Sequence, residues 1–311
     1  MPCLSHTIKE QFPQPVRLDR YVSETLRILS RSQIKARSLT AKINGKDVKN
    51  SRIVKQGDIL ELCWRDSPPV NMLPQDIPLE IIYEDENCIV INKAQGMVVH
   101  PGAGNRQDTL ANALYFKRLK RSGKESNWDT DNARPGIVHR LDKDTSGIII
   151  AAFNEEAHAF LAQQFKTRKT RKTYIAIVQG TPKEINGRIE TYIARDPRDR
   201  KKFSVSAVGR NAVTHYKVIN SWHSHSLLLL RPRTGRTHQL RVHLRHIGYP
   251  ILGDPIYGGA DKLFPDASLM LHSKSLAIVL LGETEERVFS SQIPRRFTEI
   301  IEKLDRMNTN G

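Results

Sequence analysis

From residue 79 onward, apolar residues gather in short runs that predict many strands and fewer helices. The strand-like runs are Glu80–Glu84, Cys88–Asn92, Gly147–Ala152, Thr173–Val178, Gly187–Ile193, Thr214–Ile219, Ser226–Leu230 and Leu276–Leu280. Apolar residues recur at helical spacing in Leu110–Leu119, Glu155–Phe165, His238–Ile247 and Arg296–Leu304. Because strands outnumber helices and do not alternate with them, we expect an α+β domain with a mixed, mainly antiparallel sheet.

Residues 18–64 show a second pattern, in which two short helices precede short strands. Leu18, Val22 and Leu26 recur at helical spacing, and Asn44-Gly45 between strand-like flanks indicates a hairpin. Basic side chains, Arg31 and Lys35 among them, are scattered through this stretch. The pattern suits a small RNA-binding module, and it equally suits a generic α+β unit with a solvated basic face.

Proline marks the boundary between the two patterns. Arg65 to Pro78 contains four prolines and little periodicity, which is typical of an extended linker. We therefore expect an N-terminal arm at 1–17, a small domain at 18–64, a linker at 65–78, a large domain at 79–305 and a C-terminal tail at 306–311.

Charge narrows the class of partner. The 311 residues carry a formal net charge of +16, and 39% of them are hydrophobic, so a packed core is expected together with a broad basic surface. Such a surface attracts polyanions, because each neutralised phosphate releases counterions. Nucleic acid is the leading expectation, although basicity alone does not separate RNA from DNA, anionic membrane or acidic protein.

The cysteines and the N-terminus bear on location. Cys3, Cys63 and Cys88 are isolated and odd in number, so neither a disulfide framework nor a cysteine zinc site is indicated. The first twenty residues lack the apolar run of a signal peptide, and no stretch approaches membrane-spanning length. We expect a reduced, cytoplasmic compartment and no membrane partner.

A polar loop, His139–Gly147, lies between two apolar runs and is rich in reactive side chains. It holds His139, Arg140, Asp142 and Asp144. Loops on a rigid sheet often carry catalytic groups. The same residues are also good turn formers, so the pattern by itself leaves an active site and a charged turn equally open.

Two further stretches combine basic residues with other useful chemistry. Arg231–Pro250 places His238 and Arg241 on one face of a predicted helix that ends at Gly248. Arginine is suited to bidentate recognition of phosphate or of a nearby carboxylate. Lys166–Ala176 is a basic run that enters a strand containing Tyr174, which could stack on a base or simply pack within the strand.

Several activities lack their usual patterns. The pairs His223/His225 and His238/His243 have no obvious carboxylate or cysteine to complete a tetrahedral metal site. No motif for ATP, serine hydrolysis or dinucleotide binding occurs. Asp142 and Asp144 could form a glycosidase carboxylate pair, but aromatic residues make up only 6% of the chain and the basic charge would be unexplained.

Taken together, these stretches resemble the RluA family of pseudouridine synthases. His139–Gly147 looks like the family's catalytic motif, Arg236–His243 its second block, and Lys172–Ala176 its tyrosine motif. Val98–Gly102 and Leu271–Leu276 match two further segments. Ala94, directly after Lys93, is a departure, because the family usually has proline at that position.

Within that family the likeness is greatest to the RluD branch, which modifies large-subunit ribosomal RNA. Pro74–Leu79, Tyr83–Glu86, His100–Asn105 and Ala212–Tyr216 carry this likeness, and Lys117–Asn132 departs from it. Residues 18–64 resemble the small RNA-binding domain of ribosomal protein S4. The resemblance therefore implies a monomeric enzyme that isomerises uridines of structured RNA, with a non-catalytic assembly factor or a tRNA-specific enzyme as alternatives.

The resemblance also implies roles for particular side chains. Asp142 would be the catalytic aspartate, Arg241 its ion-pair partner, and Tyr174 the ring that stacks on the target uracil. Arg140 would fill the space left by the flipped nucleotide, and His139 would brace the loop. The isomerisation requires no cofactor, nucleotide or metal. The remaining candidates for RNA binding are Leu141, Arg236, His238, Leu271, Arg31, Lys35, Lys169 and Lys172.

Overall fold

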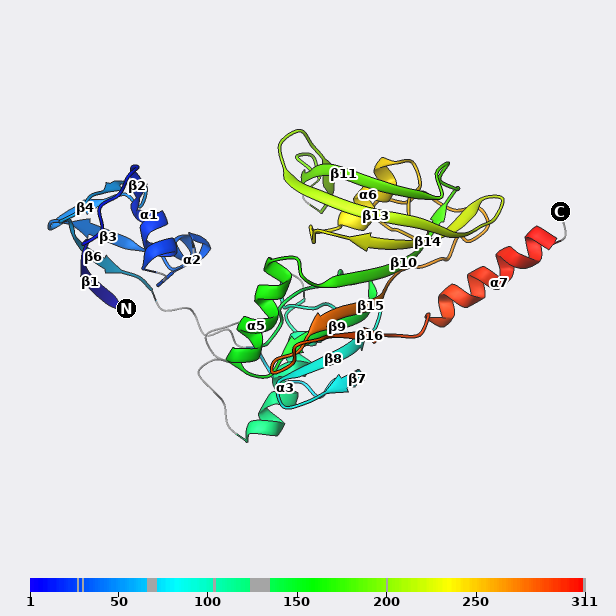
Figure 1. Cartoon of the computed structure of the whole chain (residues 1–311), viewed down its shortest axis with the longest axis horizontal. Coiled ribbons are helices and arrows are strands. Elements are labelled where there is room, and N and C mark those ends of the chain that lie inside the picture. The colour runs from blue at the N-terminus through cyan, green and yellow to red at the C-terminus, as the bar shows by residue number, and fades with distance from the viewer. Residues whose placement is uncertain are drawn as a thin grey trace. The chain divides into compact units, whose positions relative to one another are not determined.

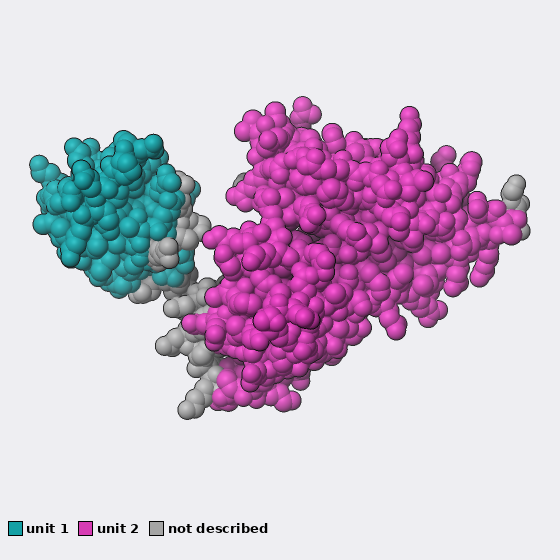
Figure 2. Space-filling view, in the orientation of Figure 1, with its two compact units in different colours: residues 1–70 teal, residues 71–311 magenta. Residues whose placement is uncertain are grey.

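The computed structural model of the chain divides into two compact units, residues 1–70 and 71–311 (Figure 2). The structure describes residues 1–26, 28–29, 31–65, 72–102, 105–123, 135–199 and 201–309. Residues 66–71 of the expected linker, part of the stretch 117–132 and part of the His100–Asn105 segment lie outside the described residues.

Unit 1 combines short helices with a four-stranded sheet of order β1-β6-β3-β4. The expected hairpin is present, and Asn44 and Gly45 occupy its turn with φ of 52° and 76°. Buried apolar side chains, among them Leu18, Tyr21 and Leu60, fill the core between helices and sheet. The elements are β1 (Cys3–Thr7), β2 (Val16–Arg17), α1 (Leu18–Arg20), the π-helix η1 (Tyr21–Thr25), α2 (Arg31–Ala36), β3 (Thr40–Ile43), β4 (Lys46–Val48), β5 (Ile53–Val54) and β6 (Ile59–Cys63).

Two features of unit 1 differ from expectation. Residues 3–7, expected to lie in a separate arm, form the edge strand β1 paired antiparallel to β6. The pairing places Cys3 directly opposite Cys63, and the two side chains form a disulfide. The expectation that no disulfide is present was therefore wrong. The cysteines are 60 positions apart, and only the strand register brings them together.

Unit 2 is built on one large sheet of order β12-β11-β13-β14-β10-β15-β9-β8-β7, with β16 also paired to β15. In the described residues β9 and β15 pair in parallel, whereas the other named strand pairs of this sheet are antiparallel. In Figure 1, β10 runs through the middle of the unit. The strands are β7 (Glu80–Glu84), β8 (Cys88–Lys93), β9 (Ser146–Ala152), β10 (Arg171–Gln179), β11 (Asn186–Arg195), β12 (Phe203–Val205), β13 (Arg210–Ser221), β14 (His225–Pro232), β15 (Leu271–Val279) and β16 (Glu286–Ser290).

The central strands β8 and β9 are apolar on both faces because helices cover both. One face, including Val90 and Ile150, packs on α5 (Glu155–Lys166) through Leu161. The other face belongs to the larger core, which includes side chains of α3 (Leu110–Ser122). Thr109 and Asn154 cap the two helices, each accepting a hydrogen bond from a backbone N–H of the first turn. A continuous apolar run is typical of a strand covered on both faces.

At the other half of the sheet, α6 (Gln239–His246) lies beside β11, β12 and β13 (Figure 1). The C-terminal helix α7 (Arg295–Thr309) buries Phe297, Ile300 and Leu304. This helix reaches into the expected tail at 306–311. Each strand and helix expected from residue 79 onward is present, within a few residues at its ends, whereas β12 and β16 were missed because both are short and half polar.

The fold is therefore mixed α+β, as expected. Gly147 shows one local constraint on it. Gly147 has φ of 112°, and a Cβ there would lie 2.2 Å from the backbone oxygen of Ser273. Only glycine permits β9 to approach β15 so closely at the end of the polar loop. In the described part of the chain, no helix is long and apolar enough to cross a membrane.

Candidate active site

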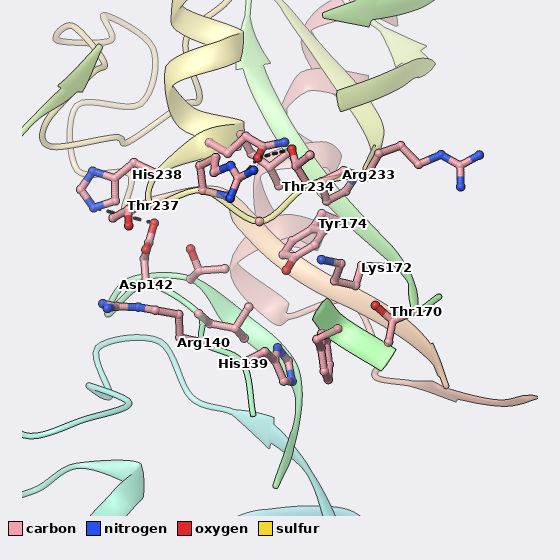
Figure 3. Close-up of a pocket in the computed structure, with 18 of the residues that line it drawn as sticks. His139, Arg140, Asp142, Thr170, Lys172, Tyr174, Arg233, Thr234, Thr237 and His238 are labelled. Atoms are coloured by element: carbon pink, nitrogen blue, oxygen red, sulfur yellow. Dashed lines mark hydrogen bonds and ion pairs between the residues drawn. The ribbon is translucent and has the colours of Figure 1, made fainter. Parts of the chain in front are cut away.

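Unit 2 contains a cavity of ≈ 490 Å³ between the polar loop that precedes β9 and the N-terminal end of α6 (Figure 3). A cavity of this size is in the usual range for small-molecule and nucleotide sites. Segments far apart in the sequence line it, and most of the candidate residues are among them. These are His139, Arg140, Leu141, Asp142, Lys172, Tyr174, Arg236, His238, Arg241 and Leu271.

A buried lysine, Lys93, fixes the backbone of the loop that carries Asp142. Lys93, at the end of β8, is 1% exposed, and its Nζ donates to the carbonyl oxygens of Ala94, Met97 and Lys143 at 2.8–3.0 Å. Burial lowers the pKa of Lys93 to about 8, although nearby carboxylates oppose this effect. These bonds fix the loop backbone directly after Asp142. The sequence showed only an ordinary lysine at a strand end.

Asp142 lies half-buried between Arg241 of α6 and His238, the residue that precedes this helix. Its Oδ2 is 3.6 Å from Nη1 of Arg241 and 3.9 Å from Nε2 of His238. Figure 3 shows the carboxylate pointing toward His238, with Arg140 extending away from Tyr174. The expected proximity of Arg241 to Asp142 is therefore present.

Arg241 has a closer partner that sequence reasoning missed. Its Nε and Nη2 donate to Asp254 Oδ2 and Oδ1 at 2.8 and 2.6 Å, and both side chains are almost fully buried. Burial lowers the pKa of Arg241, but the hydrogen bond and charge of Asp254 outweigh it and raise that pKa overall. Asp254 follows Gly253 in a turn with no chemical pattern around it, so nothing in the sequence indicated the pair. The second carboxylate holds the guanidinium where Asp142 can use it.

Tyr174 lies in β10 next to the cavity and is 8% exposed. The register against β15 shifts between Thr173 and Tyr174, which is a local irregularity of the ladder. Burial raises the pKa of Tyr174 to about 12, a hydrogen bond with Ser273 opposes this, and the charge of Asp142 adds to it. The hydroxyl therefore stays protonated at neutral pH.

His139 and Lys172 form one wall of the cavity around Phe165. The His139 ring stacks on Phe165 with centroids 4.4 Å apart, and its Nε2 accepts from the Ile150 backbone N–H at 3.0 Å. Burial, with the charge of Lys172, lowers the pKa of His139 to about 3. The ring is therefore neutral and braces the loop against β9.

The N-terminal end of α6 is fixed by buried polar side chains. Gln239 receives a hydrogen bond from Thr234 at 2.7 Å and donates to Thr214 at 3.0 Å. His243, fully buried, bonds to the hydroxyls of Thr214 and Thr191 at 2.9 and 3.0 Å. These contacts tie α6 to β11 and β13, and so they set where His238 and Arg241 meet Asp142.

Basic side chains line the cavity entrance. Burial and the charges of Arg168 and Arg210 lower the pKa of Arg236, whose Nε donates to the carbonyl oxygen of Asn211. Lys166 and Arg168 line the cavity, whereas Lys169 is exposed after α5 and does not line it.

The remaining two candidates, Arg31 and Lys35, belong to α2 of unit 1, where Lys35 is exposed. Within the described residues, no group of three or more His, Cys, Asp or Glu side chains could hold a metal ion.

Comparison with known proteins identifies the class of enzyme. The family model described as RNA pseudouridylate synthase matches residues 87–246, a stretch that includes Asp142, Tyr174 and Arg241. The chain belongs to this family and is an RNA pseudouridine synthase, an isomerase that converts uridine to pseudouridine.

Individual relatives agree with this assignment. The chain is 45% identical over 300 residues to ribosomal large subunit pseudouridine synthase D of Borreliella burgdorferi, covering 94% of this chain and 89% of the relative. It is 42% identical to the protein of that name from Zymomonas mobilis, covering 79% and 78% of the two chains. Among solved structures, human RNA pseudouridylate synthase domain containing 4 matches with a TM-score of 0.58 at 28% identity, covering 73% of this chain and 93% of that one.

Proposed function

We propose that this chain isomerises particular uridines of large-subunit ribosomal RNA, with Asp142 as the essential aspartate. The observation that carries the proposal is the cavity in which one carboxylate lies beside a guanidinium and near a buried tyrosine. The names of two relatives support ribosomal RNA as the substrate. The net charge of +16 favours an extended polyanion.

In the proposed reaction each side chain acts on one part of the nucleotide. The target uridine leaves its stack at a cost of a few kcal/mol. Tyr174 then stacks on the uracil, Arg140 fills the vacated space, and Asp142 acts at the sugar, either as nucleophile or by removing a sugar proton. Arg241, 3.6 Å from that carboxylate, balances its negative charge in both routes. Arg236 and Lys172 contact phosphates at the entrance.

Wild-type protein incubated with modification-free large-subunit ribosomal RNA tests the substrate. We expect new pseudouridines, mapped by carbodiimide labelling and primer extension, at a few defined positions. Modification of tRNA but not ribosomal RNA would support the tRNA alternative. Binding of either RNA without modification of either would instead support a non-catalytic assembly factor.

Unit 1 is proposed to be an S4-like RNA-binding domain acting with the catalytic unit. Its fold of short helices packed with a small sheet and the exposed Lys35 on α2 support this proposal. A cytoplasmic location belongs to the same proposal.

Lys35→Gln is expected to weaken RNA binding while leaving the rate of conversion of bound RNA unchanged. Losing one phosphate contact should reduce the slope of log affinity against log salt by about 1. Binding isotherms at several salt concentrations, with single-turnover rates, measure both quantities. Lys55→Gln, at another exposed lysine of unit 1, is the matched control. Equal effects of the two variants would contradict a specific role for α2.

A further inference from the structure

Conversion of uridine to pseudouridine requires the movement of one proton. The N1–C1′ bond breaks and the C5–C1′ bond forms, after which C5 must lose its proton and N1 must gain one. The net change is zero, so a single group that accepts the first proton and returns one to N1 completes the reaction. Asp142 acts at the sugar in the proposed function, on which this inference rests, and a second titratable side chain beside it can take the C5 proton.

Two other titratable side chains of the cavity are poorly suited to this step. Tyr174 keeps its hydroxyl proton at neutral pH because its pKa is raised to about 12 by burial. The Nε2 lone pair of His139 already accepts the Ile150 N–H, and the ring stacks on Phe165, so it cannot also take a substrate proton.

His238 is differently placed. It stands at the N-terminal end of α6 with φ of 55°, and its side chain is 15% exposed on the cavity wall. Edge-on contacts with Phe203 and Tyr257, at centroid distances of 5.7 and 5.6 Å, fix the ring. Its Nε2 is turned toward Asp142, at 3.9 Å from Oδ2.

The Tyr257 hydroxyl bonds one ring nitrogen of His238 and leaves the other, Nε2, on the Asp142 side. It lies 2.8 Å from Nδ1 of His238, and its oxygen also accepts from the Phe203 backbone N–H at 2.8 Å. A hydroxyl oxygen has two acceptor positions, so it can take the Phe203 N–H and the Nδ1–H together. In that tautomer Nε2 carries a lone pair on the Asp142 side of the cavity wall.

We propose that Nε2 of His238 accepts the C5 proton of the uracil once the C5–C1′ bond has formed, and then returns a proton to N1. The C5–H electron pair forms the C5–C6 double bond. The π electrons of the C6–N1 double bond move to N1, which is then protonated. Whichever route Asp142 follows, its carboxylate is free again at this stage, and at 3.9 Å it stabilises the imidazolium.

The charges around His238 fit a group that starts neutral and becomes charged briefly. Burial is the largest cause that lowers the pKa of His238, Arg241 and Arg140 lower it further, and Asp142 and Asp254 raise it. The net lowering leaves the imidazole neutral before reaction. The two carboxylates limit the cost of protonating it.

The test uses an RNA that the wild-type enzyme converts, prepared with either uridine or 5-deuterouridine at the target. For His238→Gln we expect the single-turnover rate to fall by about 10²-fold or more. We also expect a larger deuterium isotope effect than in wild type, because loss of the C5 proton becomes the slow step. For His238→Ala, added imidazole should restore part of the rate. His246→Gln, an exposed histidine of the same helix, is the control and should match wild type.

Other outcomes would overturn the inference. If the isotope effect in His238→Gln equals that of wild type, His238 does not take the C5 proton. The same conclusion follows if the isotope effect rises in Tyr174→Phe and not in His238→Gln. Tyr257→Phe, which removes only a hydroxyl, should show a smaller fall in rate with a raised isotope effect, and it covers the case in which His238→Gln misfolds. Asp142→Asn tests the proposed function separately. If that variant is active, Asp142 is not the essential aspartate, and the isotope result for His238 still stands.

Discussion

Asp142→Asn is expected to abolish pseudouridine formation, lowering the single-turnover rate by at least about 10³-fold while RNA binding is retained. The amide has nearly the shape of the carboxylate, but it neither attacks the sugar nor accepts a proton from it. Asp142 is partly exposed, and Arg241 keeps its closer partner Asp254 without it, so the variant should fold normally. Rates on the RNA converted by wild type, with filter-binding affinities, measure both properties.

Asp144→Asn is the matched control for this variant. Asp144 lies in the same loop, and its backbone oxygen accepts a hydrogen bond from the side chain of Gln95. We expect nearly wild-type rates for it. Full activity of Asp142→Asn, or equal losses in the two variants, would contradict the assignment of Asp142 as the essential aspartate.

Arg241→Met is expected to abolish activity and to lower the free energy of unfolding by about 3–5 kcal/mol. Removing the guanidinium leaves Asp254 buried without its main partner and Asp142 without its nearest cation. Denaturant unfolding followed by circular dichroism measures the stability. Arg245→Met, at an exposed arginine one turn further along α6, should change stability little.

Replacing both members of the buried pair distinguishes its two effects. Arg241→Met combined with Asp254→Leu should recover part of the stability, because no unpaired charge remains, and recover no activity. Recovery stays partial because Asp254 also accepts from the backbone N–H groups of Ile256 and Tyr257. Stability of the double variant below that of Arg241→Met would contradict this account of the pair.

The buried pair also has a pH dependence of known sign. Burial raises the pKa of Asp254, but the hydrogen bond and charge of Arg241 outweigh it, so that the pKa is lowered overall. A carboxyl whose pKa is lower in the folded state stabilises the fold above its unfolded pKa of about 3.9. That stabilisation is lost as the pH falls through the folded value. Wild type should therefore lose more stability than the double variant on strong acidification.

Much of the fold was predictable because local pattern determined it. The run Cys88–Asn92 is apolar at nearly every position, and the structure covers both faces of that strand. Asn44-Gly45 requires positive φ at both turn positions, which is typical of a hairpin. The short strands β12 and β16 escaped prediction because three to five residues of mixed polarity carry too little periodicity.

For the site, the sequence by itself indicated three segments that line one cavity in the structure: the loop around Asp142, the strand with Tyr174 and the helix with Arg241. Only the tertiary structure decided the partners, namely Asp254 for Arg241 and Tyr257 for His238. It also decided that Cys3 meets Cys63, against expectation. The physical reason is the same in each case. Helix and strand periodicity is set by neighbours a few residues away, whereas a side-chain contact across many residues depends on how whole elements pack.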